Sequence, residues 1–142
     1  MALEGLVALT AIQGAIFVVP ALPKSWLQQG AITPFTDFTI PAVALGVVCG
    51  GSALLALVTV VTRPWIGALA SIVAGLIMVG FEAVEIAVVG FTPMLYPAQP
   101  QAWLQPFYLA VGAAMSVLGG YLWWVLARSF RLVPIEERPR RQ

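Results

Sequence analysis

Residues 65–90 read WIGALASIVAGLIMVGFEAVEIAVVG, and this stretch decides the fold. A helix needs about 20 consecutive apolar residues to cross the hydrocarbon core of a membrane, and the only charged side chains in the stretch are Glu82 and Glu85. Similar apolar windows give four expected spans at 3–22, 40–62, 65–90 and 104–127. None of them shows the two-residue alternation of barrel strands. We therefore expect an all-α fold, a bundle of four transmembrane helices within residues 1–132.

The composition excludes several classes of protein. Of the 142 residues, 61% are hydrophobic and 9% are charged, whereas an average soluble domain has about 25% charged residues. The chain has no histidine and one cysteine, Cys49, so it offers no imidazole for zinc or haem and no thiol pair for a disulfide. Its net charge of +1 provides no basic surface for nucleic acid. We expect a membrane protein without catalytic machinery, cofactor or nucleic-acid partner.

The basic residues set the expected orientation. Six of the seven Lys and Arg residues fall on one side of the expected spans and only Lys24 on the other; the six are Arg63, Arg128, Arg131, Arg138, Arg140 and Arg141. Because membrane proteins keep an excess of Lys and Arg in cytoplasmic segments, we expect both termini in the cytoplasm. The charged tail at residues 133–142 is expected to be flexible.

A short repeat relates the two halves of the chain. Residues 20–28 read PALPKSWLQ and residues 97–105 read PAQPQAWLQ, with six identities in nine positions. Each copy follows an outward-going span, which predicts two helical hairpins related by an axis along the membrane normal. The alternative is that Pro and Trp simply recur at helix ends.

Three of the expected spans carry small residues at the spacing of one helical face. In lipid, helices pack where small side chains let their backbones approach. The residues are Ala42, Gly46 and Gly50 in the second span, Gly67, Ser71 and Gly75 in the third, and Gly112, Ser116 and Gly120 in the fourth. We expect them to make the helix–helix contacts of the bundle.

Two acidic residues lie on the packing face of the third span. At 1.5 Å per residue, Glu82 and Glu85 stand about 25 and 30 Å from the inner end of that span, close to its outer end. Three further polar residues lie at a similar depth at the outer ends of neighbouring spans: Asp37, Gln105 and Tyr108. We expect these five side chains to converge.

Two interpretations of this cluster remain open. In the first, Glu82, Glu85 and Asp37 form an outward-facing site for a proton, a metal ion, or a cationic or hydroxylated ligand, because acids inside a membrane mark ion and proton pathways. In the second, protonated glutamates hydrogen-bond Gln105, Tyr108 or nearby hydroxyl groups and hold the helices together. The sequence does not identify a metal.

Several short motifs carry a resemblance. They are PFTDFTIP at 34–41, GGS at 50–52, RPW at 63–65, GFEAVE at 80–85 and WLQPFY at 103–108. Together they resemble the small four-helix integral membrane proteins of many bacteria, a family without an assigned activity. The resemblance implies a four-helix fold in a bacterial inner membrane. It does not extend to small multidrug transporters, whose essential glutamate lies midway along the first helix, where this chain has Gln13.

Two functions are therefore expected. The first is that of an accessory or stabilising subunit of a larger membrane complex, which contacts other subunits or further copies of itself through its small-residue faces and aromatic outer loops. The second is the handling of a small ligand, an ion or a proton by the outer carboxyl cluster. Both expectations place the chain in the lipid bilayer, and neither requires an enzyme.

Overall fold

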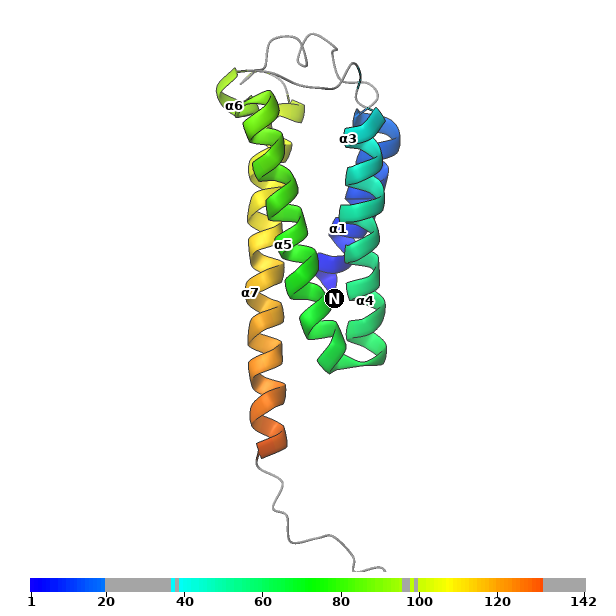
Figure 1. Ribbon diagram of the computed structural model, residues 1–142, viewed down its shortest axis with the longest axis vertical. Coiled ribbons are helices and arrows are strands. Elements are labelled where there is room, and N and C mark those ends of the chain that lie inside the picture. The colour runs from blue at the N-terminus through cyan, green and yellow to red at the C-terminus, as the bar shows by residue number, and fades with distance from the viewer. Residues whose placement is uncertain (20–36, 38, 96–97, 99, 132–142) are drawn as a thin grey trace, which may run out of the picture.

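The computed structural model describes residues 1–19, 37, 39–95, 98 and 100–131, and the regular structure in these residues is helical. In chain order the elements are α1 (Ala2–Gln13), the π-helical segment Gly14–Val18, α3 (Thr39–Val43), the π-helical segment Ala44–Gly50, α4 (Gly51–Thr62), α5 (Pro64–Val89), α6 (Thr92–Leu95), the 3-10 turn Pro100–Trp103 and α7 (Leu104–Arg131). Figure 1 shows the long helices running alternately up and down.

Three helical stretches are long and apolar enough to cross a membrane. They are Thr39–Thr62, Leu104–Ser129 and the stretch that begins at Pro64, whereas the first apolar helix, Ala2–Phe17, is shorter. At 1.5 Å per residue that first helix spans about 24 Å, less than a hydrocarbon core of about 30 Å. The expected all-helical, membrane-type chain is confirmed. A fourth complete crossing is not shown, and residues 20–22 of the expected first span lie outside the described residues.

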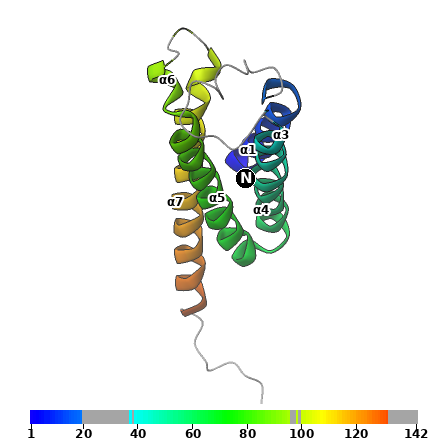
Figure 2. The same ribbon diagram turned by 45° about the horizontal axis from the view of Figure 1, so that its top comes forward.

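The helices associate as two pairs. The first, called the α1 pair, consists of α1 with its segment Gly14–Val18 and of the continuous stretch Thr39–Thr62, which is made of α3, Ala44–Gly50 and α4. The second, called the α7 pair, consists of α5 and α7. The two pairs meet along α4 and α5, and they part toward the end where α3 begins in both views of the ribbon (Figures 1 and 2). All four long stretches contribute to a single hydrophobic core, whose most buried side chains include Val7, Ala11, Cys49, Met78 and Met115.

Backbone contact through small residues holds the α7 pair together and joins it to α4. A Cβ atom at Gly67 would overlap the backbone of Val60 in α4, and one at Gly75 would overlap the Gly112 carbonyl oxygen in α7. Ser116 Oγ donates a hydrogen bond to the carbonyl oxygen of Ile72 at 3.3 Å. Helices approach this closely only where side chains are small, which explains the small-residue spacing.

Small residues also line the contact within the α1 pair. Ala42 is buried. A Cβ atom at Gly46 would lie 2.9 Å from Ala15 Cβ, and one at Gly50 would lie 2.8 Å from Ile12 Cγ1. Both distances are longer than the closest one at Gly75, so the approach is looser than in the α7 pair.

The assignment of Gly120 to the packing face of α7 is wrong. A Cβ atom at Gly120 would have nothing within 4 Å, whereas one at Gly119 would lie 2.9 Å from the Ala68 carbonyl oxygen. The reason is helical phase: seven residues from Gly112 make almost two full turns, but eight residues overshoot the contact by about 80°. Gly119 therefore contacts α5 where Gly120 was expected to.

The π-helical segments were not expected from the sequence. Residues Gly14–Val18 and Ala44–Gly50 contact each other within the α1 pair. A π-helical turn hydrogen-bonds residue i to i+5, and such turns inside α-helices often occur at functional sites. The expected repeat is not tested by the structure, because its first copy, residues 20–28, lies outside the described residues. The same is true of the expected flexible tail, residues 133–142.

Candidate functional site: two glutamates near the end of α5

Helix α5 turns its two acidic side chains away from its exposed face. Glu82 is only 2% exposed and Glu85 is partly buried, whereas Ala83 and Val84 between them are exposed. Residues three or four positions apart share a helical face, so the three-residue spacing keeps both carboxyls on the side that faces the other helices. The exposed side of α5 is left apolar at this level.

Gln105, the second residue of α7, forms a side-chain hydrogen bond with Glu85. Gln105 Nε2 donates hydrogen bonds to Glu85 Oε1 at 3.0 Å and to the Gly90 carbonyl oxygen at 3.2 Å. Its Oε1 atom accepts a hydrogen bond from the Thr92 backbone amide at 2.9 Å. Both donors of the buried amide are used, together with its acceptor. The Gln105 side chain therefore fastens the start of α7 to the end of α5.

The link between α5 and α7 is shaped to bring Gln105 into this position. Gly90 ends α5 with a φ of +91°, a backbone conformation that residues with a Cβ atom rarely adopt. Thr92, which is buried, donates a hydrogen bond from Oγ1 to the Ala102 carbonyl oxygen at 2.7 Å. We call the four residues Glu85, Gly90, Thr92 and Gln105 the outer clamp.

Glu82 is not part of the outer clamp. Its Oε2 atom is buried and has no hydrogen-bond partner. The described polar groups close enough to interact with it electrostatically are Glu85, the Tyr108 phenol and the Cys49 thiol. Tyr108 and Cys49 are themselves 5% and 1% exposed. Glu82 is thus a buried acid without a cation beside it in the described part of the chain.

The surroundings of Glu82 join the two helix pairs. Cys49 belongs to the π-helical segment Ala44–Gly50, and Tyr108 belongs to α7. A Cβ atom at Gly14, the first residue of the other π-helical segment, would lie 3.8 Å from the Tyr108 hydroxyl oxygen. The two irregular turns of the α1 pair therefore lie at the level of the unpartnered acid.

Asp37 does not complete a metal site. Asp37 Oδ1 accepts a hydrogen bond from the backbone amide of Thr39, the first residue of α3, at 2.9 Å. A side-chain acceptor in this position satisfies an amide that the helix leaves unpaired. Among the described residues, no three His, Cys, Asp or Glu side chains are placed to hold a metal ion. The expectation that three carboxyls converge as a metal site is therefore not supported by this geometry.

Of the five expected site residues, the structure brings four into one neighbourhood. Glu85 and Gln105 contact each other directly. Glu82 and Tyr108 interact electrostatically beside them. The two interpretations drawn from the sequence therefore fit different residues. Glu85 has the hydrogen bond of the structural interpretation, whereas the buried Oε2 atom of Glu82 has none among the described residues.

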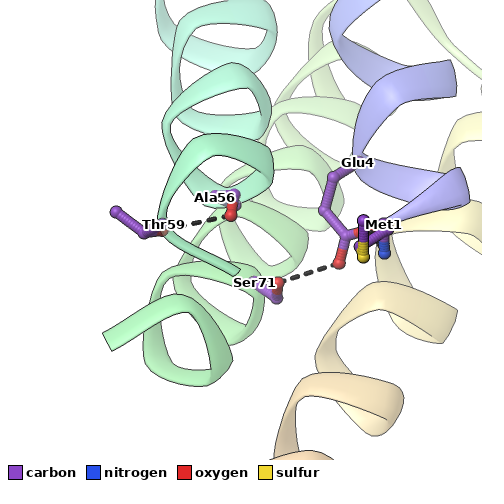
Figure 3. Close-up of polar contacts among 5 residues, drawn as sticks. All are labelled: Met1, Glu4, Ala56, Thr59 and Ser71. Atoms are coloured by element: carbon purple, nitrogen blue, oxygen red, sulfur yellow. Dashed lines mark hydrogen bonds and ion pairs between the residues drawn. The ribbon is translucent and has the colours of Figure 1, made fainter. Parts of the chain in front are cut away.

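Sequence reasoning missed a second buried acid. Figure 3 shows Glu4 of α1 pointing toward Ser71 of α5, and Ser71 Oγ donates a hydrogen bond to Glu4 Oε1 at 2.8 Å. The N-terminal ammonium of Met1 forms an ion pair with Glu4 Oε2. Glu4 is 7% exposed. A single acid in an otherwise apolar helix was the available signal, because such a residue needs a polar partner in lipid.

The chain was compared with protein-family models, with curated proteins and with solved structures, and no match was found. The resemblance to small bacterial four-helix membrane proteins therefore stays a prediction.

Proposed function

We propose that this chain is a non-catalytic integral membrane protein that takes up and releases a proton, or a small cationic or hydroxylated ligand, at Glu82. The observation that carries the proposal is the Glu82 Oε2 atom, which is buried without a hydrogen-bond partner. A buried polar atom without a partner costs about 1–3 kcal/mol, and an ionised acid at the centre of a membrane costs about 2.5–3.5 kcal/mol. A bound proton, cation or hydrogen-bond donor reduces this cost.

The contrast with Glu85 supports assigning the role to Glu82. The Glu85 carboxyl already accepts a hydrogen bond from Gln105 Nε2, and that amide also holds the end of α5. A ligand at Glu85 would have to compete with the outer clamp. Glu82 offers a free oxygen in the same neighbourhood, so a ligand can bind there without breaking a bond of the fold.

Tyr108 and Cys49 supply the nearest polar groups in the described chain. Both interact electrostatically with Glu82, and a phenol can donate or accept a hydrogen bond. In the proposal, Tyr108 accepts from or donates to the ligand while Glu82 provides the acidic oxygen. Cys49 belongs to one π-helical segment, and the Tyr108 hydroxyl lies near the first residue of the other. The winding of the α1 pair is irregular there.

The test uses the purified chain in liposomes that enclose a pH-sensitive dye. A pH gradient is imposed, and proton uptake is compared for the wild type, Glu82→Gln and Glu85→Gln. We expect Glu82→Gln to lose the uptake while Glu85→Gln retains most of it. Binding of ethylammonium, measured by calorimetry in detergent, provides the cation arm, and again only Glu82→Gln should lose the signal.

The control for folding is the helical circular dichroism and the elution volume of each variant. Gln has nearly the same shape as Glu and fills the same space, so both variants should keep the wild-type values. If wild type and Glu82→Gln behave alike with protons and with ethylammonium, Glu82 has no such role and the proposal is wrong.

A second candidate is an accessory subunit of a larger membrane complex, and the inner end of α7 favours it. Trp65, at the start of α5, packs against Trp123 with ring centroids 5.5 Å apart, and α7 continues from there to Arg131. Figure 1 shows this part of α7 extending past the α4–α5 link. Arg128 lies over the Trp124 ring, 3.7 Å from its centroid, and both side chains are exposed.

Co-purification from native membranes tests the second candidate. Replacing Trp124 and Arg128 by Ala should release the partner chains if this part of α7 binds them, while Leu118→Ala, on the apolar surface of α7, should not. Extraction of the wild type without any other chain would contradict the subunit proposal. In both candidates we place the chain in a bacterial inner membrane with both termini in the cytoplasm, in line with the bias of its basic residues.

A further inference from the structure

Helix α1 packs with only one of its faces. Its buried residues are Glu4, Val7, Ala8 and Ala11, and the helix contacts α4, the segment Ala44–Gly50 and, less extensively, α7. The opposite face is bare in the described structure. Its exposed side chains are Leu6, Leu9, Gln13, Ile16 and Phe17.

The bare face follows the spacing of a helix–helix seam. Leu6, Leu9, Gln13 and Ile16 are separated by three, four and three residues, which is the a/d repeat of helices that pack side by side. Leu9 is 67% exposed and Ile16 is 59% exposed. Because residues Gly14–Val18 wind as a π-helix, Phe17 lies beside the same line. We call Leu6, Leu9, Gln13, Ile16 and Phe17 the α1 seam.

Gln13 distinguishes the α1 seam from an ordinary lipid-facing surface. Its side chain is exposed, and its amide forms no hydrogen bond with the described part of the chain. Gln13 precedes Gly14, and Gly14 lies near the Tyr108 hydroxyl. Tyr108 comes one helical turn after Leu104, the first residue of α7, so Gln13 lies at about the depth of that turn. An amide at this depth gains from a partner that both donates and accepts hydrogen bonds.

We propose that the α1 seam joins two copies of this chain as a parallel dimer in which the two Gln13 amides hydrogen-bond each other. Copies inserted in the same orientation pair about an axis along the membrane normal, so each residue meets its own counterpart at the same depth. A charged residue at such a position would repel its counterpart. An amide carries both a donor and an acceptor, so two glutamines form reciprocal hydrogen bonds.

The α1 seam is separate from the proposed Glu82 site. Its side chains point away from the core that contains Glu82, Cys49 and Tyr108. A single polar residue in an apolar a/d seam fixes the register and the number of helices that associate. The dimer therefore does not depend on Glu82, and Glu82→Gln should leave it unchanged.

Disulfide crosslinking in membranes tests the dimer. Cys49 is replaced by Ala to give a cysteine-free background, and Gln13→Cys, Leu6→Cys and Val84→Cys are introduced singly. Val84 is the control, since it is 63% exposed on α5 near the same outer end of the molecule. We expect Gln13→Cys and Leu6→Cys to give mostly crosslinked dimer on mild oxidation, at least fivefold more than Val84→Cys.

The role of the amide is tested by energy transfer between labelled copies in liposomes. Gln13→Leu should weaken the dimer by about tenfold, while Gln13→Asn, which keeps the amide, should stay within about threefold of the wild type. Equal crosslinking at Gln13→Cys and Val84→Cys would contradict the proposal. So would a Gln13→Leu dimer as stable as the wild type, or crosslinking of Gln13→Cys only to a different protein.

Discussion

The two helix pairs are built differently although the sequence suggests related hairpins. The α7 pair consists of two unbroken α-helices of 26 and 28 residues, in backbone contact at Gly75 and Gly112. The α1 pair contains two π-helical segments, and the atoms nearest to a Cβ at its glycines belong to side chains. The α7 pair thus holds its geometry through backbone contact, while the irregular part of the α1 pair lies at the level of Glu82.

This contrast separates the polar groups that have hydrogen-bond partners from one that has none at a buried oxygen. In the α7 pair, Gln105 and Ser116 have hydrogen-bond partners on the neighbouring helix. Between the pairs, Ser71 of α5 has its partner in Glu4 of α1. Glu82 differs from them, since its Oε2 atom has neither a hydrogen bond nor an ion pair within the described part of the chain, whereas Glu4 Oε2 pairs with the Met1 ammonium. A buried polar group that the packing leaves unpaired requires a physical explanation, and a ligand that pairs with it is the one that we propose.

The largest expected effect is that of Gly75→Ala. The new methyl group would overlap backbone atoms of Gly112 and Ser116, and rigid backbone cannot move aside without separating α5 from α7. We expect a loss of about 3 kcal/mol in the free energy of unfolding, measured by SDS-induced unfolding in mixed micelles. Gly46→Ala is the matched change in the α1 pair and should cost about 1 kcal/mol. Equal losses would remove the distinction between the pairs.

Gln105→Leu should have the next largest effect. It leaves Glu85 Oε1, the Gly90 carbonyl oxygen and the Thr92 amide without their partner, at a cost of about 1–3 kcal/mol. The same unfolding assay measures it. Glu85→Gln is the control, because its amide oxygen still accepts from Gln105 Nε2 and the loss should stay below about 1 kcal/mol. An unchanged Gln105→Leu protein would mean that the outer clamp does not hold the α7 pair.

Ser71→Ala tests the polar contact between the pairs. It removes the hydrogen bond to the buried Glu4 carboxyl, and we expect a loss of about 1 kcal/mol. Ser129→Ala is the control, since Ser129 Oγ is exposed and bonds within its own helix to the Val125 carbonyl oxygen. That change should be neutral within about 0.5 kcal/mol. A Ser71→Ala value equal to the control would show that Glu4 finds another partner.

Gly120→Ala should have the smallest effect, with the opposite sign. A methyl group there meets nothing within 4 Å, and Ala is favoured over Gly inside a helix by about 0.5–1 kcal/mol. We expect a slightly more stable protein, whereas Gly119→Ala should destabilise it because Ala68 and Ile72 are in the way. If both changes destabilised the protein to the same degree, the rotation of α7 about its axis would differ from the one in the structure, which turns Gly119 and not Gly120 toward α5.

The sequence predicted those features that follow from periodicity and hydropathy. Apolar length predicted an all-helical membrane-type chain, and the spacing of Gly67 and Gly75 predicted a close helix contact on α5. The same spacing failed at Gly120, because a window of small residues does not fix rotation to within one residue. The expected end of the first span at residue 22 lies outside the described residues.

The remaining features depend on tertiary contacts that no local pattern encodes. The sequence suggested that Gln105 and Glu85 lie at the same depth, but the three hydrogen bonds of the Gln105 amide follow from how the link after Gly90 folds back. The partner of Glu4 lies 67 positions away in Ser71. The π-helical segments have no established sequence signal in this chain. Glu82 and Glu85 look alike in the sequence and differ only in their neighbours.

The proposed site is tested most directly by measuring whether the Glu82 carboxyl has a hydrogen bond. Infrared spectroscopy of the purified protein in lipid resolves carboxyl C=O stretching bands, and a carboxyl without a hydrogen bond absorbs at higher frequency than one that accepts a hydrogen bond. We predict a high-frequency band that disappears in Glu82→Gln and remains in Glu85→Gln. A Glu82 band at the frequency of a hydrogen-bonded or water-exposed carboxyl would show that the acid is already satisfied, and would contradict the proposed site.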